Sequence, residues 1–160
     1  MDINFKGLSD IYSQISKNLK EIAHSMNEIL EDAWREKSKN VLLLRVFLNY
    51  TNLLARDISL ADILREKGYR RCGIYGYGNV GQCVYIDLIN HGFEVTYVVD
   101  RAYQMLDRDS LECIWHSPED AMEETDVLLV TPVFSFREVY EVMKDKVSCP
   151  IVSIDDFVQE

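Results

Sequence analysis

The first part of the chain carries apolar residues separated by alternating steps of three and four positions. The pattern comprises Phe5, Leu8, Tyr12, Ile15, Leu19, Ile22, Met26, Ile29 and Ala33. The flanking positions are polar, so only a narrow stripe of the predicted helix favours burial. Such spacing is typical of a heptad seam, which packs against another helix in a coiled coil or an antiparallel helix pair.

A second apolar helix is predicted over residues 41–50, after the polar segment 37–40. It is apolar around most of its circumference and must be covered on several sides. We therefore expect an N-terminal α-helical hairpin within a helical dimerisation region, residues 1–66. A second copy of the chain would supply the missing cover, giving a homodimer through residues 5–56. The alternative is that the hairpin packs entirely against its own chain.

From residue 67 onward, short apolar runs alternate with helical patterns. Strands are predicted over residues 72–75, 95–99, 112–115, 126–130 and 150–154, and helices are predicted after Ser59, over 79–90, after Ser117 and after Ser135. Near-continuous apolar strands separated by helices predict a parallel sheet covered on both faces. Right-handed crossovers then give a five-stranded α/β fold with strand order 3-2-1-4-5 over residues 67–160.

Three glycines stand between the first predicted strand and its helix, at Gly76, Gly78 and Gly81. This G-x-G-x-x-G spacing is typical of a Rossmann-like dinucleotide-binding unit: the glycines permit a tight turn, close approach to a pyrophosphate and close helix packing. The N–H groups that open the helix would face an anion. Asp100 ends the next strand, 19 residues after Gly81. A carboxylate there accepts hydrogen bonds from a ribose 2′-OH, which favours NAD over NADP.

The remaining site residues follow from the rule that ligands of such sheets bind beyond the carboxyl ends of the strands. The predicted cofactor-binding residues are Gly76, Tyr77, Gly78, Asn79, Val80, Gly81, Asp100, Arg101, Thr131 and Pro132. Arg101 either stacks on an adenine ring or points to solvent. Tyr77 either covers the ligand or occupies the place of a phosphate. His116 is a weak candidate for a general acid or base, against the alternative of a histidine bonded to backbone or solvent.

Charge and cysteine usage narrow the classes of partner. The chain has a net charge of −10, and residues 67–160 hold 17 acidic against 8 basic side chains. This field repels phosphate backbones and anionic membranes, which argues against nucleic-acid and membrane partners. The four scattered cysteines lack metal-ligand spacing, so we expect structural thiols and no metal. With no signal peptide or membrane-length apolar run, the expected location is cytoplasmic.

Several segments resemble a largely uncharacterised bacterial group of small Rossmann-like domains. They are residues 74–81, 95–101, 117–120, 126–132 and 149–157. Domains of this group are of the NAD(P)- or nucleotide-sugar-binding type, and many occur alone or fused to enzymes of surface-polysaccharide biosynthesis. The resemblance covers about residues 59–157 and implies a binding site without naming a reaction.

The predicted elements of residues 67–160 assign no segment to a second, substrate-binding domain. We therefore expect a non-catalytic or accessory module, a sensor or regulatory subunit that binds a dinucleotide, with NAD(H) as the expected ligand. One alternative is an oxidoreductase or nucleotide-sugar-modifying enzyme whose pocket a partner chain completes. Another is an interaction scaffold with a vestigial glycine loop.

Overall fold

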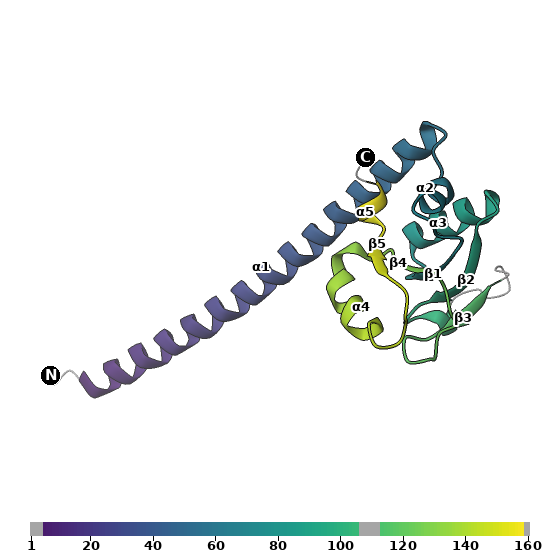
Figure 1. Cartoon of the computed structure of the whole chain (residues 1–160). Helices are drawn as coiled ribbons and strands as arrows, with labels where there is room; N and C mark the ends of the chain where they lie inside the picture. The colour runs from purple at the N-terminus through teal and green to yellow at the C-terminus, as the bar shows by residue number, and fades with distance from the viewer. Residues whose placement is uncertain (1–4, 106–112, 159–160) are drawn as a thin grey trace. The chain divides into compact units, whose positions relative to one another are not determined.

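Five parallel strands form a single sheet in the order β3-β2-β1-β4-β5 (Figure 1). The computed structural model describes residues 5–105 and 113–158, with side chains from residue 13 onward. The strands are β1 (Arg71–Tyr75), β2 (Glu94–Val99), β3 (Ile114–His116), β4 (Val127–Val130) and β5 (Ile151–Ser153). The predicted α/β class and strand order are confirmed; the start of the third predicted strand, at residue 112, lies outside the described residues.

A long first helix and a short second helix precede the sheet, and further helices follow β1, β4 and β5. They are α1 (Phe5–Ala55), α2 (Leu60–Glu66), α3 (Asn79–Asn90), α4 (Phe136–Met143) and α5 (Asp155–Val158), with short 3-10 turns η1 (Tyr103–Met105) and η3 (Val133–Ser135). The described helices include none that is both long and apolar enough to cross a membrane.

The predicted helical hairpin is wrong, because α1 continues without a break through residues 37–40. The segment is Lys-Ser-Lys-Asn and contains neither glycine nor proline. Its polar side chains suit an exposed helix as well as a loop, so nothing in it ends the helix. The chain divides into two compact units, Met1–Val41 and Leu42–Glu160. The sheet unit therefore begins inside α1, earlier than the predicted start at residue 67.

The first unit exposes its heptad seam. Side chains of the seam are between 51% and 68% accessible, namely Ile15, Leu19, Ile22, Met26 and Ile29. Its ion pairs are i,i+3 or i,i+4 contacts on the helix surface, such as Lys17 with Glu21. Surface pairs of this kind contribute little to stability. Most of the stability of a helix in a protein comes from packing of its apolar face against other elements, and this seam has no such packing in the single chain.

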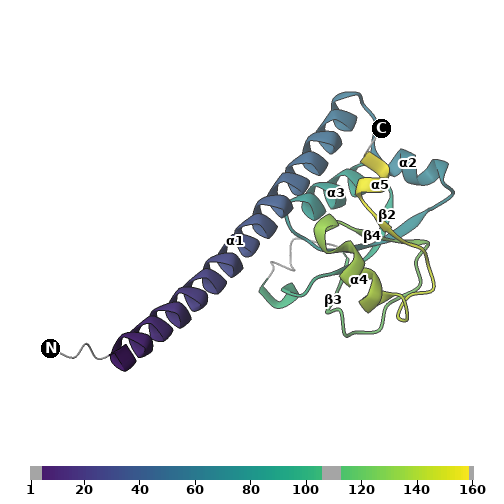
Figure 2. The same ribbon diagram turned by 90° about the vertical axis from the view of Figure 1, so that its left-hand side faces the viewer.

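The second unit has a hydrophobic core on each face of the sheet. On one face, Val46 and Tyr50 of α1 pack with residues of α2, α3 and α5 against strand residues such as Ile74. On the other face, Val139 and Met143 of α4 cover the alternate strand residues. Figures 1 and 2 show α3 and α4 on opposite sides of the sheet. Alternation along each strand thus buries both faces, as expected for a parallel sheet.

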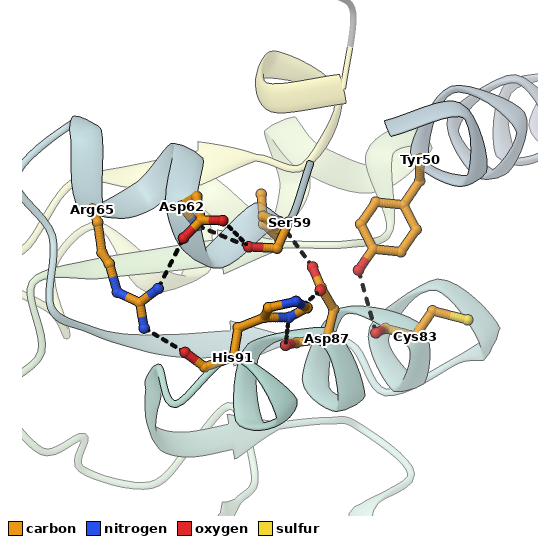
Figure 3. Close-up of polar contacts among 8 residues, drawn as sticks. Tyr50, Ser59, Asp62, Arg65, Cys83, Asp87 and His91 are labelled. Carbon is orange, nitrogen blue, oxygen red and sulfur yellow. Dashed lines mark hydrogen bonds and ion pairs between the residues drawn. The ribbon is translucent and has the colours of Figure 1, made fainter. Parts of the chain in front are cut away.

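Polar contacts join α2 to α3 (Figure 3). The buried Asp87 carboxylate accepts a hydrogen bond from the backbone N–H of Leu60 at 2.9 Å, and its other oxygen lies 2.9 Å from His91 Nδ1. The Ser59 hydroxyl accepts from Asp62 N–H, which confirms the predicted cap of α2. Gly68 follows this helix with a φ of +88°, as a C′ glycine does.

Two predicted local features differ from the structure. Residues 117–120 form a turn instead of a helix: the Asp120 carboxylate accepts from Ser117 N–H at 2.7 Å, and Asp120 N–H donates to Ser117 O. These bonds satisfy the backbone groups that a helix would have used. Ser135 does precede α4, but its side chain makes no capping hydrogen bond.

The four cysteines are free thiols, as expected, although only Cys72 is fully buried. Burial raises the pKa of the Cys72 thiol far above its usual range, and raises that of Cys113 to about 11. Both therefore remain protonated at neutral pH. A protonated thiol is neither a nucleophile nor a metal ligand.

Candidate functional site

The glycine loop between β1 and α3 begins with a residue that only glycine suits. Gly76 has a φ of +91°, in the left-handed region. Its N–H donates to the carbonyl of Val99 at 2.8 Å, which extends the pairing of β1 with β2. A Cβ at Gly76 would lie 2.6 Å from Cδ of Pro132. The predicted tight turn is therefore packed directly against the loop that follows β4.

The other two motif glycines have different surroundings. A Cβ at Gly81 would overlap the carbonyl oxygen of Gly76, so α3 approaches the turn as closely as the backbone allows. A Cβ at Gly78, in contrast, would meet no protein atom within 4 Å. Gly78 has φ −69° and ψ −170°, which other residues also adopt. No residue in the described part of the chain lies where a Cβ of Gly78 would be, whereas Gly81 is required by packing.

Asp100 braces the glycine loop. Its Oδ2 accepts a hydrogen bond from Tyr77 N–H and its Oδ1 accepts one from Ala102 N–H, both at 2.7 Å. A carboxylate has about four acceptor positions, so capacity remains for the hydroxyls of a ribose. The sequence indicated a ligand contact at this position but gave no sign of the second, positioning role.

Thr131 joins the loop from the β4 side. Its buried hydroxyl lies 2.8 Å from the carbonyl oxygen of Gly76 and 3.2 Å from that of Tyr75. The pyrrolidine of Pro132 packs on Gly76. Thr131 and Pro132 therefore hold the turn in place through a hydrogen bond and a packing contact.

Tyr77 turns away from the loop surface. Its ring packs edge-on against Trp115, with centroids 4.9 Å apart, and against Tyr85 at 6.0 Å. Burial raises the pKa of its phenol above the usual value. This orientation depends on an aromatic partner from β3, Trp115, that the motif does not contain.

A cavity of about 820 Å³ lies over the glycine loop. It is lined by Leu43, Leu44, Phe47, Tyr75, Gly76, Gly78, Asn79, Val80, Gly81, Gln82, Cys83, Ile86, Asp100, Arg101, Thr131, Pro132, Ser135 and Val139. Its volume is within the range of cofactor sites. Of the ten predicted site residues, nine line this cavity and Tyr77 does not.

One wall of the cavity was not predicted. Leu43, Leu44 and Phe47 of α1 line it, within the part of α1 that belongs to the sheet unit. The apolar pattern of residues 41–50 indicated that this helix needed cover on several sides. Val46 and Tyr50 receive that cover in the core, whereas the three wall residues face the cavity.

The charged residues of the lining are Asp100 and Arg101, which follow β2 side by side. The helix α3 starts at the same place, with Gly78 as its N-cap. The N–H groups of a first helical turn have no partners within the helix and carry partial positive charge. The arrangement therefore offers N–H donors to an anion and a carboxylate to hydroxyl groups, within one cavity.

His116 is not part of this lining. Its Nε2 lies 2.6 Å from Glu123 Oε2, and its Nδ1 lies 3.7 Å from Asp120 Oδ2. Burial is the largest single influence on the pKa of Glu123 and raises it, but the hydrogen bond with His116, a backbone hydrogen bond and the charge of His116 together lower this pKa by more, so that the net shift is downward. The histidine has the orienting partners of a catalytic base but does not face the cavity.

The strand order, the glycine turn and the position of Asp100 together define a Rossmann-like α/β domain. Comparison of the chain with models of protein families, with curated proteins and with solved structures found no match. The functional argument therefore depends on the geometry of the site itself.

Proposed function

We propose that the chain is a non-catalytic or accessory module that binds a dinucleotide, NAD(H), in the cavity over the glycine loop and acts as a sensor or regulatory subunit. The observation that carries this proposal is the open space at Gly78. The first turn of α3 opens into the same cavity, where its N–H groups can donate to a pyrophosphate. No packing partner of the described residues explains a glycine there, but close approach of a pyrophosphate does.

The composition of the lining supports binding more than chemistry. No histidine or lysine is among the residues that line the cavity, within the described part of the chain. Each oxygen of Asp100 accepts one backbone hydrogen bond from the loop region, which leaves positions to accept further hydrogen bonds from a ligand. His116, the candidate acid or base, lies outside the lining. Histidine is the side chain that most often transfers protons in active sites, and none lines the described part of the cavity.

Calorimetry with NADH, NAD⁺, NADP⁺ and a UDP-sugar tests the ligand class. We expect NAD(H) to bind and NADP⁺ to bind more weakly than NAD⁺, because its 2′-phosphate would meet the Asp100 carboxylate. Asp100→Asn removes the negative charge and keeps one side-chain carbonyl oxygen to accept from the loop. It should therefore reduce the difference in affinity between NAD⁺ and NADP⁺. The melting temperature of the same samples reports whether the loop remains intact.

Three outcomes would contradict the proposal. Absence of binding to every nucleotide at millimolar concentration would favour a scaffold with a vestigial loop. Binding of the UDP-sugar in place of NAD(H) would retain a nucleotide site and exclude the dinucleotide. Turnover of a bound nucleotide would replace the accessory role by an enzymatic one.

We also propose that the exposed seam of α1 forms a homodimer with a second copy of the chain. Five seam residues are more than half exposed, and their spacing lets two helices interlock over roughly the same length. Burial of one large aliphatic side chain stabilises by about 1.5–3 kcal/mol. Burial of the seam residues of two chains would therefore provide enough free energy to offset the rotational and translational entropy lost on association.

Light scattering on the full chain tests the dimer. Ile22→Glu with Ile29→Glu places four buried carboxylates in the seam of a dimer and should yield monomers. His24→Glu with Ser38→Glu changes the charge equally at exposed helix positions outside the seam and should leave the dimer intact. A wild-type chain that is monomeric at micromolar concentration, or equal behaviour of the two double variants, would contradict the proposal.

A further inference from the structure

The part of α1 that belongs to the sheet unit has two apolar faces, of which the chain covers one. Val46, Tyr50 and Leu53 are buried in the core of that unit. Leu44 and Leu48 stand two residues before and after Val46, which turns them to the opposite side of the helix. Both side chains are more than half exposed. The described residues therefore leave this outer face of α1 open to solvent.

The outer face borders the cavity and extends past it. Leu44 lines the cavity, as do Phe47 of the same helix and Ile86 of α3. Leu48 and Ile89, each one turn further along its helix, are 52% and 45% exposed and do not line the described part of the cavity. A ligand in the cavity would cover the first three side chains but not the last two. An apolar patch that continues beyond a small-molecule site is typical of a protein interface.

The spacing of apolar residues along α1 indicates that another helix covers this patch. Beyond the seam, five side chains that are each more than half exposed recur at steps of four, seven, three and four positions, namely Leu30, Trp34, Val41, Leu44 and Leu48. This stripe begins beside the seam residue Ile29, so it continues the seam with a shift of one position, and α1 runs through it without a break. Such steps suit knobs-into-holes packing with a second helix, and a second copy of α1 offers the same pattern.

A polar gap in the stripe indicates the direction of the second helix. Lys37 takes the position between Trp34 and Val41 at which the repeat would place an apolar residue. Seam and stripe together span residues 15–48, so this gap lies away from their centre. A parallel partner in register places the two gaps opposite each other, whereas an antiparallel partner matched over the same span places Lys37 opposite Met26. Burial of a lysine against an apolar side chain is costly, which favours the parallel arrangement.

We propose that the α1 helix of a second copy completes the dinucleotide cavity, so that dimerisation and binding of the dinucleotide strengthen each other. The inference rests on the proposed function. In a parallel pair, Leu44 and Leu48 lie against the same residues of the second copy, and the partner's helix extends the apolar wall of the cavity. A ligand that contacts Leu44 and Phe47 is then covered by both chains. A ligand that binds the dimer more tightly than the monomer favours the dimer to the same extent.

Sedimentation equilibrium with and without NADH, together with calorimetry, tests this coupling on the full chain. We expect each site to bind NADH about tenfold more tightly in the dimer, within the usual range of coupling between sites. With two sites, saturating NADH should lower the dimer dissociation constant about a hundredfold. The monomeric seam variant, Ile22→Glu with Ile29→Glu, should bind NADH about tenfold more weakly than the wild-type dimer. Neither position lines the cavity, so this loss would not come from direct contacts with the ligand.

Leu48→Glu tests the part of the interface next to the cavity. In a dimer it places two carboxylates opposite each other, so it should weaken both dimerisation and the affinity for NADH. Val142→Glu is the matched control, because it places the same charge at an exposed apolar position of α4 that does not line the described part of the cavity. It should retain the wild-type values of both constants.

The outcomes separate this inference from the proposed function. Equal NADH affinity of the wild-type dimer and the seam variant, or dissociation of the dimer by NADH, would overturn the coupling and leave a dinucleotide site in place. Equal effects of Leu48→Glu and Val142→Glu, or a wild-type chain that stays monomeric with saturating NADH, would also overturn it. Failure of NADH to bind any of these chains would overturn the dinucleotide site and the coupling with it.

Discussion

The Gly81→Ala variant is expected to unfold at markedly lower urea concentration than the wild-type chain, with a loss of about 3 kcal/mol in the free energy of unfolding. The added methyl group would overlap the carbonyl oxygen of Gly76. That carbonyl cannot easily move, because the Thr131 hydroxyl binds it and Pro132 packs on the same turn. Relief of the overlap would require displacement of α3 from β1. Urea unfolding of the intact chain measures the effect.

Gly78→Ala provides the matched control, since it adds the same methyl group three residues earlier in the motif. Its backbone angles suit alanine, and the methyl group meets no protein atom. We expect its unfolding free energy to stay within about 0.5 kcal/mol of wild type, as for substitutions away from packed sites. Equal stability of the two variants would contradict the close packing of α3 on the glycine turn.

The same Gly78→Ala variant is expected to lose affinity for NADH by about a hundredfold, or about 2.7 kcal/mol. Its methyl group would enter the space over the loop that the proposal assigns to the pyrophosphate. The phosphate oxygens could then no longer approach the first-turn N–H groups of α3 to within hydrogen-bonding distance. Calorimetry measures the loss, and the unchanged unfolding curve of the variant shows that it does not arise from misfolding.

Retention of wild-type NADH affinity by Gly78→Ala would place the ligand elsewhere. Taken together, the two alanine variants separate the two roles of the motif. We expect Gly81 to serve the packing of the domain and Gly78 to serve binding of the proposed ligand.

Residues that mark the ends of helices made most of the sheet domain predictable. The helix α3 has the predicted bounds, because glycines stand at both of its ends and the second, Gly92, adopts the expected positive φ of 65°. The lead-in helix α2 is marked in the same way by Ser59 and Gly68. Where such signals are short-range and unopposed, the sequence determines the element.

The errors arose where the same residues suit two local structures. Residues 37–40 are compatible with a loop or with an exposed helix, and the absence of glycine and proline allowed α1 to continue. Ser117 is able to cap a helix, but its backbone N–H is taken by Asp120 in a turn. In both cases the polar side chains are compatible with either local structure, so the sequence pattern alone does not decide between them.

The candidate site was predictable only in its local part. The motif located the glycine loop and Asp100, because their spacing along the chain reflects one βαβ unit. The wall formed by Leu44 and its neighbours depends on a long-range packing arrangement between α1 and the sheet. The inward turn of Tyr77 likewise depends on Trp115, a contact across 38 positions of sequence. Apolar periodicity indicates that a face is covered but does not identify what covers it.

We expect the first turn of α3 to hold the pyrophosphate of a dinucleotide, and amide hydrogen exchange followed by NMR measures this contact at each backbone amide. With saturating NADH, the account predicts increased protection and large shifts of the amides of Asn79, Val80 and Gly81. The amide of Tyr77 is already bonded to Asp100 and should change little. Binding of NADH that leaves the three first-turn amides unchanged would contradict the account.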